Sequence, residues 1–470
     1  MSTENKAKRS SFTGTLGFIM AAAGSAVGLG NIWRFPYLAA KDNGGVFILV
    51  YVILAVTFGF TLLTTEIAIG RKTAQSPLTA YGLIHPKFKW VGVPACLVPV
   101  IILPYYCTIG GWVVKYLTVF ITGKGAEAAK DGYFTGYITQ NVFPVIFMAV
   151  FLGLTAFVVF SGVNKGIEKY NKVLMPALLV LIAGISVYSL TLKFTDESGF
   201  TRTGLEGLKI YLIPDFSGMT VGDFAAVITD ALGQLFFSIS VAMGIMVTYG
   251  SYVKKDANLM KSINQIEIFD TIVALLAGMM IVPAVFTFMG EEGMSAGPGL
   301  MFVSLPKVFE EMGTAGNVIG SLFFIMVLFA AVTSSVSVME AIVSSIMDKF
   351  GLTRKKSAAI VTAYALVGGI IVCLGYNLLY FEVTLPNGTV AQVLDIMDYI
   401  SNNCLMPLVA LLTCILIGWV TGSKVIIDEV TSGGVKFGRK TLYVVMIKFI
   451  APILLFLLLL QSVGILKISG

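Results

Sequence analysis

Two stretches of this sequence place polar and flexible residues inside runs that are otherwise apolar. The first, "GSAVGLGNIWRFPY" at residues 24–37, contains three glycines and Arg34. Glycine costs a helix interior about 1 kcal/mol relative to alanine, and arginine at mid-membrane costs about 2.5–3.5 kcal/mol on insertion scales. The second, "GQLFFSISVAMG" at residues 233–244, contains Ser238 and Ser240. Each stretch predicts a membrane helix that is broken near its middle.

A break of this kind exposes backbone groups that lipid cannot satisfy. Freed N–H groups at a helix N-terminus suit a carboxylate. Freed carbonyls, together with hydroxyl and amide side chains, suit a hard cation such as Na⁺. Two broken helices therefore predict a site that takes a zwitterion and a cation together.

A third stretch, "FAAVTSSVSVME" at residues 329–340, carries the hydroxyls of Thr333, Ser334 and Ser337 on nearby faces of one long helix. Next to the breaks, such hydroxyls are candidate ligands for a cation. Small residues at this spacing also let membrane helices pack closely, and the stretch alone does not separate these two interpretations.

The elements that must position these stretches are membrane-spanning helices. The 470 residues are 57% hydrophobic and only 12% charged, which excludes a soluble domain. A span needs about 20 mostly apolar residues, and this measure predicts about eleven spans in an all-α polytopic membrane protein. They are expected near residues 13–39, 44–70, 90–122, 141–161, 166–190, 223–252, 261–290, 312–348, 355–376, 393–421 and 440–466.

Charged residues in the connections predict the orientation of the chain. Connections on one side hold basic clusters such as those at Lys165 and Arg354, whereas the others hold acids such as Glu291 and Glu310. The positive-inside rule therefore predicts a cytoplasmic N-terminus. The formal net charge of +6 then reflects orientation, and we expect no nucleic-acid surface. Five cysteines in apolar runs and a single histidine predict neither a disulfide framework nor a metal cluster.

The broken spans are the first and the sixth, which predicts two five-helix repeats of inverted topology with the binding site between them. The expected organisation is a cytoplasmic tail at residues 1–12, a first repeat at 13–190, an extracellular connection at 191–222, a second repeat at 223–421 and a last helix at 440–466.

Eight motifs, in order along essentially the whole chain, resemble those of the neurotransmitter:sodium symporter family. They are "GSAVGLGNIWRFPY", "NGGVFILVY", "TEIAIGR", "LPYYCTIGGW", "KGIEKYNKVLMP", "GQLFFSISVAMG", "TYGSYVKKD" and "AAVTSSVSVM". Among members of that family, the chain is most similar to the bacterial transporters of leucine and other hydrophobic amino acids. Family members commonly have twelve spans, whereas this chain is predicted to have one fewer.

The resemblance implies two sodium sites and no organic cofactor. The first sodium site falls on Ala26, Asn31 and Ser238, with Asp270 beside it and the substrate carboxylate as a further ligand. The second falls on the carbonyls of Gly24, Val27 and Ala330 and the hydroxyls of Thr333 and Ser334.

The resemblance also implies a substrate site. The expected residues are Ser25, Ala26, Val27, Gly28, Leu29, Gly30, Ile102, Tyr106, Phe237, Ser238, Ser240, Met243, Ser334 and Val338. Tyr106 matches the tyrosine that holds the substrate carboxylate. Monoamine carriers of the family have an aspartate where this chain has Gly28, so the substrate should bring its own carboxylate. The apolar lining then favours leucine, isoleucine, valine, methionine or an aromatic L-amino acid.

Gates on both faces are implied as well. The expected gate residues are Arg34 and Asp398 outside, and Arg9, Asp348 and Tyr252 on the cytoplasmic side. Tyr106 and Phe237 should form the lid beneath the outer pair. Phe12 stands where a tryptophan is usual, and Glu340 replaces a glutamine beside the inner gate. The alternative for such pairs is a surface ion pair worth about 0–1 kcal/mol.

Two acids inside spans require partners. Glu66 is expected to be protonated or bonded to unwound backbone of the broken helices. Asp270, in "IFDTIVALLAG", takes the place of a neutral asparagine or of the neighbouring halide position in chloride-dependent relatives, beside Tyr51, Gln234 and Ser238. A fixed carboxylate there supplies the negative charge that chloride would otherwise bring close to sodium. Transport is therefore expected to be independent of chloride.

The expected function is Na⁺-coupled symport of a hydrophobic L-amino acid across a bacterial inner membrane by alternating access, by a multi-pass protein that is no enzyme. The alternative is an amino-acid sensor on the same scaffold that does not transport; complete gates on both faces argue against it. A channel would need a polar pore, and an enzyme would need a nucleophile–base pair. The expected partners are the amino acid and the lipid bilayer, without nucleic acid, and the chain is expected as a monomer or homodimer.

Overall fold

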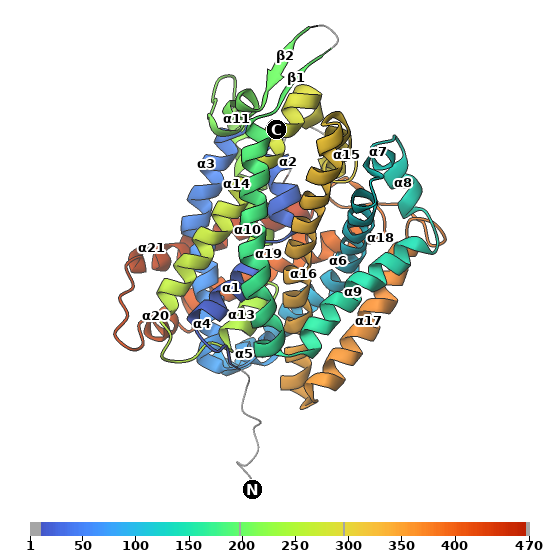
Figure 1. Ribbon diagram of the computed structural model, residues 1–470. Coiled ribbons are helices and arrows are strands. Elements are labelled where there is room, and N and C mark those ends of the chain that lie inside the picture. Colours follow the sequence, from blue (N-terminus) through green and yellow to red (C-terminus); the bar gives the residue numbers. More distant parts are fainter. Residues whose placement is uncertain (1–10, 197–198, 295–296, 467–470) are drawn as a thin grey trace.

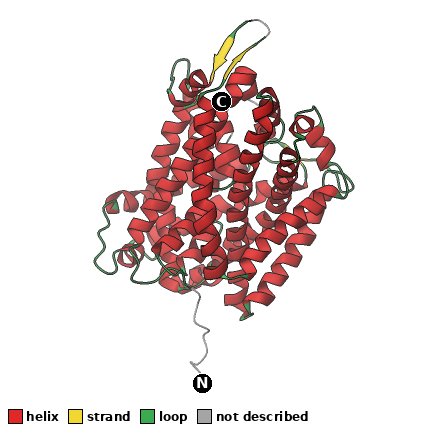
Figure 2. Cartoon of the chain, in the orientation of Figure 1, coloured by secondary structure: helices red, strands yellow, loops and turns green. Residues whose placement is uncertain are grey.

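The computed structural model describes residues 11–196, 199–294 and 297–466. These residues form one bundle of helices, and strands occur among them only in two short hairpins; one hairpin projects from an end of the bundle (Figure 2). In this part of the chain nine helical segments are long and apolar enough to cross a membrane, and one bent pair of helices makes a tenth. The predicted all-α polytopic fold is confirmed.

The two ends of the bundle differ (Figure 1). One end carries the hairpin of β1 (Lys193–Thr195) and β2 (Thr201–Thr203) beside α11 (Gly204–Leu212), and we call it the hairpin end. The opposite end carries α5 (Pro77–Ile84) and α20 (Lys424–Val430), and we call it the basic end because Arg71, Lys255 and Arg439 lie there.

In the first half, the first and second spans consist of shorter helices joined by π-helical turns. They are α1 (Thr15–Ala26), η1 (Gly30–Arg34), α2 (Phe35–Lys41), α3 (Gly45–Leu54), η2 (Ala55–Gly59) and α4 (Phe60–Thr73). The elements that follow are η3 (Pro86–Val91), α6 (Gly92–Ile121), α7 (Gly125–Ala128), α8 (Tyr133–Ile138), α9 (Phe143–Phe160), η4 (Val163–Glu168) and α10 (Lys169–Leu190).

The second half begins with another interrupted span. Its elements are α12 (Val221–Ser238), α13 (Ile245–Gly250), α14 (Leu259–Met294), η5 (Gly297–Leu300), α15 (Ser304–Glu311), α16 (Thr314–Phe350), α17 (Arg354–Leu374), β3 (Val383–Thr384), β4 (Val390–Ala391), α18 (Val393–Asp398), η6 (Tyr399–Leu405), α19 (Met406–Ile415) and η7 (Leu416–Val420). The last span consists of α21 (Lys440–Val445), η8 (Met446–Ile450) and α22 (Ala451–Ser462).

Both predicted breaks are present. Helix α1 ends at Ala26, Val27 is extended at φ −76° and ψ 97°, and the axis bends by 50° before α2. Helix α12 ends at Ser238, and the six residues before α13 contain Ser240 and Ala242 in the left-handed region at φ 53° and 60°. A left-handed non-glycine residue is uncommon and costs about 1–3 kcal/mol. The α12–α13 pair accounts for the eleventh predicted span.

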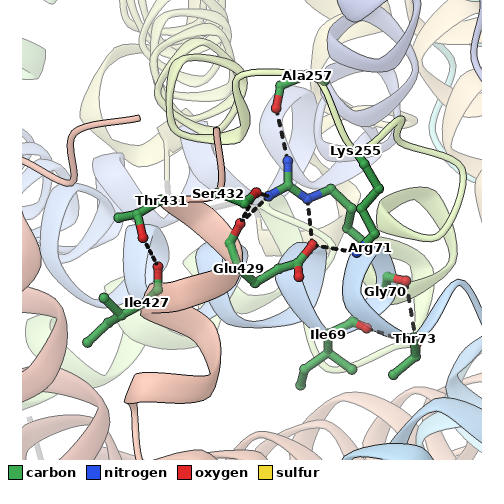
Figure 3. A network of polar contacts seen from close by, with 10 residues as sticks. All are labelled: Ile69, Gly70, Arg71, Thr73, Lys255, Ala257, Ile427, Glu429, Thr431 and Ser432. Atoms are coloured by element: carbon green, nitrogen blue, oxygen red, sulfur yellow. Dashed lines mark hydrogen bonds and ion pairs between the residues drawn. The ribbon is translucent and has the colours of Figure 1, made fainter. Parts of the chain in front are cut away.

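At the basic end, Arg71 ties the end of α4 to two loops (Figure 3). Its guanidinium donates to Glu429 Oε1 at 2.8 Å, to the Ala257 carbonyl at 2.9 Å and to Ser432 Oγ at 3.0 Å. Lys255 Nζ lies 2.9 Å from the same carboxylate. Burial raises the pKa of Glu429, but Lys255 and Arg71 outweigh it and hold that pKa below its usual range.

Replacing Arg71 by alanine should leave the Glu429 carboxylate without its buried partner. Removing one member of a buried, hydrogen-bonded ion pair costs about 3–5 kcal/mol, so we expect a clear loss of stability. Thermal unfolding of the purified protein in detergent measures it. Lys72, which is exposed on the same turn, provides the control Lys72→Ala; equal unfolding temperatures for the two variants would contradict the structural role of Arg71.

Candidate functional site

A small cavity lies between the two breaks, about midway along the bundle. About 360 Å³ of space there is not filled by protein atoms, and this figure includes space open to solvent. Its walls come from the first break, α6, the second break and α16, and its lining is Ser25, Ala26, Gly28, Gly30, Asn31, Ile102, Tyr106, Phe237, Ser240, Met243, Ile245, Ser334 and Val338. Of the predicted substrate residues, only Val27, Leu29 and Ser238 do not line it.

The hydroxyl of Tyr106 faces this cavity from α6. Tyr106 is buried, and its hydroxyl oxygen has no hydrogen-bond partner among the described residues. A Cβ added at Gly28 would lie 3.4 Å from that oxygen and 2.6 Å from Ser334 Oγ. The absence of a side chain at position 28 therefore keeps both hydroxyls open toward the cavity.

One side of the first break is bound to Asp270 of α14. Asn31 Nδ2 donates to Asp270 Oδ1 at 2.8 Å and to Ser238 Oγ at 2.9 Å. The Ser238 hydroxyl donates to the same carboxylate at 2.9 Å, and Tyr51 Oη lies 3.4 Å from it. Asp270 is fully buried, and in the described part of the chain only these neutral donors contact it. The arrangement is a buried carboxylate that no basic side chain compensates.

The other side of the first break meets α16. Ser334 Oγ lies 3.5 Å from the carbonyl oxygen of Gly24, 3.2 Å from that of Ser25 and 3.4 Å from that of Val27. Thr333 Oγ1 lies 3.0 Å from the Ala330 carbonyl on the same helix. All five residues predicted for the second sodium site are buried here; Ser334 lies within hydrogen-bond range of Gly24 and Val27, and Thr333 within that of Ala330.

The two breaks are also joined to each other and to α4. Ser25 and Ser240 lie 3.1 Å apart through their hydroxyls, and Ser240 Oγ donates to the Ser25 carbonyl at 2.9 Å. The Ala242 N–H donates to Glu66 Oε1 at 2.6 Å. Glu66 thus satisfies unwound backbone at the second break, as predicted, and its other oxygen has no partner in the described chain.

The predicted outer ion pair is not formed. Arg34 and Asp398 lie farther apart than the 4.0 Å that defines an ion pair. Asp398 instead accepts hydrogen bonds from Tyr105 Oη at 3.2 Å and from Asn402. Arg34 lines a second cavity, of about 710 Å³, that lies next to the central one because Phe237 lines both. Arg34 faces a cavity in this structure, and closure of the site by Arg34 and Asp398 stays a prediction.

The basic end is closed by contacts to the start of the chain and to α17. The Phe12 N–H donates to the Tyr252 carbonyl at 3.1 Å, and its ring packs on Tyr249 and Tyr252. Tyr252 Oη donates to Glu340 at 2.6 Å, and Arg354 binds both oxygens of that carboxylate at 2.6 and 2.7 Å.

The predicted pair of Arg9 with Asp348 lies outside the described residues, because Arg9 is not among them. Asp348 accepts from the Ser76 N–H at 2.7 Å.

Three residues near the sites were missed from the sequence. Ile245 completes the apolar lining of the cavity, and Arg354 completes the network of Glu340. Asn171 of α10 lies against Gly24, and its amide oxygen is buried without a partner among the described residues. A signal existed for Arg354, because the unusual Glu340 required a basic partner at the same end of the bundle.

Comparisons with known proteins agree on one family. The model of the sodium:neurotransmitter symporter family matches residues 9–131 and 135–469. An uncharacterized sodium-dependent transporter of Bacillus subtilis, YhdH, is 36% identical over 96% of this chain and 97% of its own length. A sodium-dependent transporter of Haemophilus influenzae is 33% identical over 89% and 91%. The crystal structure of MhsT in complex with L-phenylalanine superimposes with a TM-score of 0.84 at 34% identity, covering 97% of this chain and all of that one.

Replacing Glu340 by glutamine should loosen the basic end, because Arg354 and Tyr252 then lose their charged partner. Each 1.4 kcal/mol changes an equilibrium about tenfold, and breaking a buried pair costs more than that. We therefore expect a cysteine introduced at the buried Ser337 to react at least about tenfold faster with a small thiol reagent when Glu340→Gln is also present. The exposed Glu310→Gln is the control. If the cysteine at position 337 reacted equally fast with and without Glu340→Gln, Glu340 would not hold the basic end closed.

Proposed function

Because the chain belongs to the sodium:neurotransmitter symporter family, we propose that it carries a hydrophobic L-amino acid together with Na⁺ across the membrane by alternating access. As a member of that family it is a sodium-dependent symporter and not an enzyme. The two inverted repeats would comprise residues 13–190 and 223–421, and the basic end would face the cytoplasm of a bacterial cell. The monomeric or homodimeric state stays a prediction.

The observation that carries this proposal is the uncompensated carboxylate of Asp270. A buried charge without a partner is costly, and a bound Na⁺ would remove that cost. The Ser238 hydroxyl and the Asn31 amide contact this carboxylate, and Ala26 lines the same cavity as Asn31. A substrate carboxylate in that cavity could therefore complete the shell of the ion. Substrate and sodium would then bind together, because each supplies charge that the other needs.

A second ion would lie where α1 ends and α16 passes. The hydroxyl of Ser334 lies 3.5 Å from the Gly24 carbonyl oxygen and 3.4 Å from that of Val27, so both hydrogen bonds are long. Oxygen ligands that converge without strong mutual hydrogen bonds suit a monovalent hard cation. This ion would hold the first break against α16 and so favour one arrangement of the gates.

The cavity supports an amino acid with an apolar side chain. The hydroxyl of Tyr106 and the free N–H groups of the first break would hold the substrate carboxylate. Carbonyls at the two breaks would hold the amine. Ile102, Met243 and Val338 supply the apolar wall, and methionine can adapt to side chains of different shape. L-Phenylalanine in the related MhsT structure fits the same class.

Closure at one end at a time completes the mechanism. The basic end is held by the Glu340–Arg354 network, and the cavity at Arg34 lies next to the central one, so entry of substrate past Arg34 fits this structure. Pairing of Arg34 with Asp398 would then close the site above Phe237, and release of Glu340 from Arg354 would open it below. A sensor on this scaffold would bind the amino acid without moving it, and uptake separates the two functions.

We expect purified protein in proteoliposomes to accumulate L-leucine or L-phenylalanine when a Na⁺ gradient is imposed, and not when K⁺ replaces Na⁺. Asn31→Ala and Thr333→Ala should each weaken the dependence on sodium, since each removes a side-chain ligand. Tyr106→Phe should lower substrate affinity by about tenfold or more, the usual effect of losing a hydrogen bond to a charged group. Sodium-dependent binding without uptake would favour the sensor instead.

Uptake should continue unchanged when gluconate replaces chloride, because Asp270 supplies the fixed negative charge beside the first sodium site. Asp270→Asn should lower the apparent affinity for sodium by at least about tenfold, since the Coulomb attraction is strong in a buried site. Sodium titrations of amino-acid binding measure this change. If transport by the native protein stopped in gluconate, the role given to Asp270 would be wrong.

A further inference from the structure

A separate acidic cavity lies at the hairpin end, where the outer halves of the two broken helices come together. It holds about 1040 Å³ and shares no lining residue with the central cavity, but it shares Asp230 and Gln461 with the cavity at Arg34. Its walls are the end of α2, residues 217–219, α12 and α22, and its polar lining includes Lys41, Asp42, Asn43, Asp223, Asp230 and Gln461. The transport mechanism proposed above does not use these groups.

One ammonium group in this cavity serves two carboxylates on different elements. Lys41 Nζ, at the end of α2, lies 2.7 Å from Asp230 Oδ2 of α12. The same nitrogen lies 3.7 Å from Asp42 Oδ1. The Lys41–Asp230 pair therefore joins the outer halves of the two broken helices, and Asp42 competes with Asp230 for the lysine.

Asp42 is the unusual member of this group. The residue is only 8% exposed, and its Oδ2 has no hydrogen-bond partner in the described part of the chain. Burial and the nearby charge of Asp230 raise the pKa of Asp42 to about 7. The unpartnered oxygen beside a water-accessible cavity is a place where a proton can bind.

We propose that Asp42 is a proton-binding site that sets the strength of the Lys41–Asp230 ion pair between the two outer half-helices. When Asp42 is ionised, its carboxylate attracts Lys41 and repels Asp230. Both interactions weaken the ion pair that joins α2 and α12. When Asp42 is protonated, both interactions are lost and Lys41 forms an ion pair with Asp230 alone. External acid thus tightens the junction that lies above the outer cavity.

The other charged groups near Asp42 do not change the competition between Asp42 and Asp230 for Lys41. Asp223 caps the N-terminus of α12, where it accepts from the N–H and hydroxyl of Thr220. Asp215, on the neighbouring loop, accepts from the N–H and hydroxyl of Ser217. Lys41 is the one basic side chain lining the cavity within the described residues. Both of these carboxylates are engaged within their own segments, and the raised pKa of Asp42 comes from burial and Asp230.

The sign of the pH effect follows from the direction of the pKa shift. Asp42 keeps its proton up to about pH 7 in the folded protein, whereas an unfolded chain releases it near pH 4. The folded state therefore binds more protons between these values, and its stability falls as the pH rises through them. From pH 5.5 to 8.5, the unfolding temperature of the native protein should fall by about 2–4 °C relative to that of Asp42→Asn.

Two further variants test whether Lys41 and Asp230 control the protonation of Asp42. Lys41→Met removes the cation and should move the pH midpoint of this difference upward. Asp230→Asn removes the like charge and frees the lysine for Asp42, so it should move the midpoint downward. Asp215→Asn, on the same surface, is the control and should leave the midpoint where it is. An Asp42→Asn protein with the pH profile of the native one, or midpoints that stay fixed in the Lys41 and Asp230 variants, would overturn the proposal.

The consequence for transport rests on the proposed function and is measured separately. Sodium-driven uptake of L-leucine by the native protein should change by about threefold or more between external pH 5.5 and 8.5, and uptake by Asp42→Asn should change less. If no variant or native protein takes up amino acids, the proposed function fails while the unfolding experiments still decide the proton site. If uptake occurs and its pH profile is the same in Asp42→Asn, the coupling of this site to the gate is wrong.

Discussion

The whole arrangement depends on the fact that a peptide group inside a membrane must have a partner. Two helices give up several of their own hydrogen bonds at mid-depth, and every group set free in this way has to be satisfied by protein or by ligand. Part of the work is done inside the chain, since Glu66 accepts from the Ala242 N–H and Ser240 bonds to the Ser25 carbonyl. The backbone groups at the two breaks that no protein group satisfies face the cavity and the oxygens around it. Their lack of hydrogen-bond partners favours the binding of a ligand there.

The sequence could predict the breaks because their cost is local. Glycines, a proline and polar residues in an apolar run contradict a continuous helix, and the structure has breaks at both places. Most of the residues that the family resemblance implied for the substrate site line one cavity, because that lining comes from the same motifs. Asp270 was recognised as unusual for the same reason, and it does lie among Asn31, Ser238 and Tyr51.

Other features could not be read from the residues. The distance between Arg34 and Asp398 depends on which conformation the protein adopts, and one sequence encodes all of its conformations. Ile245 and Asn171 reach the sites through the path of the backbone around each break, which no periodicity reveals. The sequence did not point to Asp42, because an aspartate next to Lys41 suggests an ordinary surface ion pair. Only the fold shows that Asp230 of α12 lies close to the same lysine.

The missing side chain at position 28 has an evolutionary consequence. Any larger residue there would press on the Ser334 hydroxyl, which belongs to the oxygen cluster next to the ends of α1 and α16. If the proposed second sodium site lies there, a mutation at position 28 toward a new substrate class would disturb it in the same step, and a compensating change on α16 would have to accompany it. Substrate and ion specificity would then be epistatic, so a lineage could exchange one substrate for another only along paths that keep sodium binding at every intermediate.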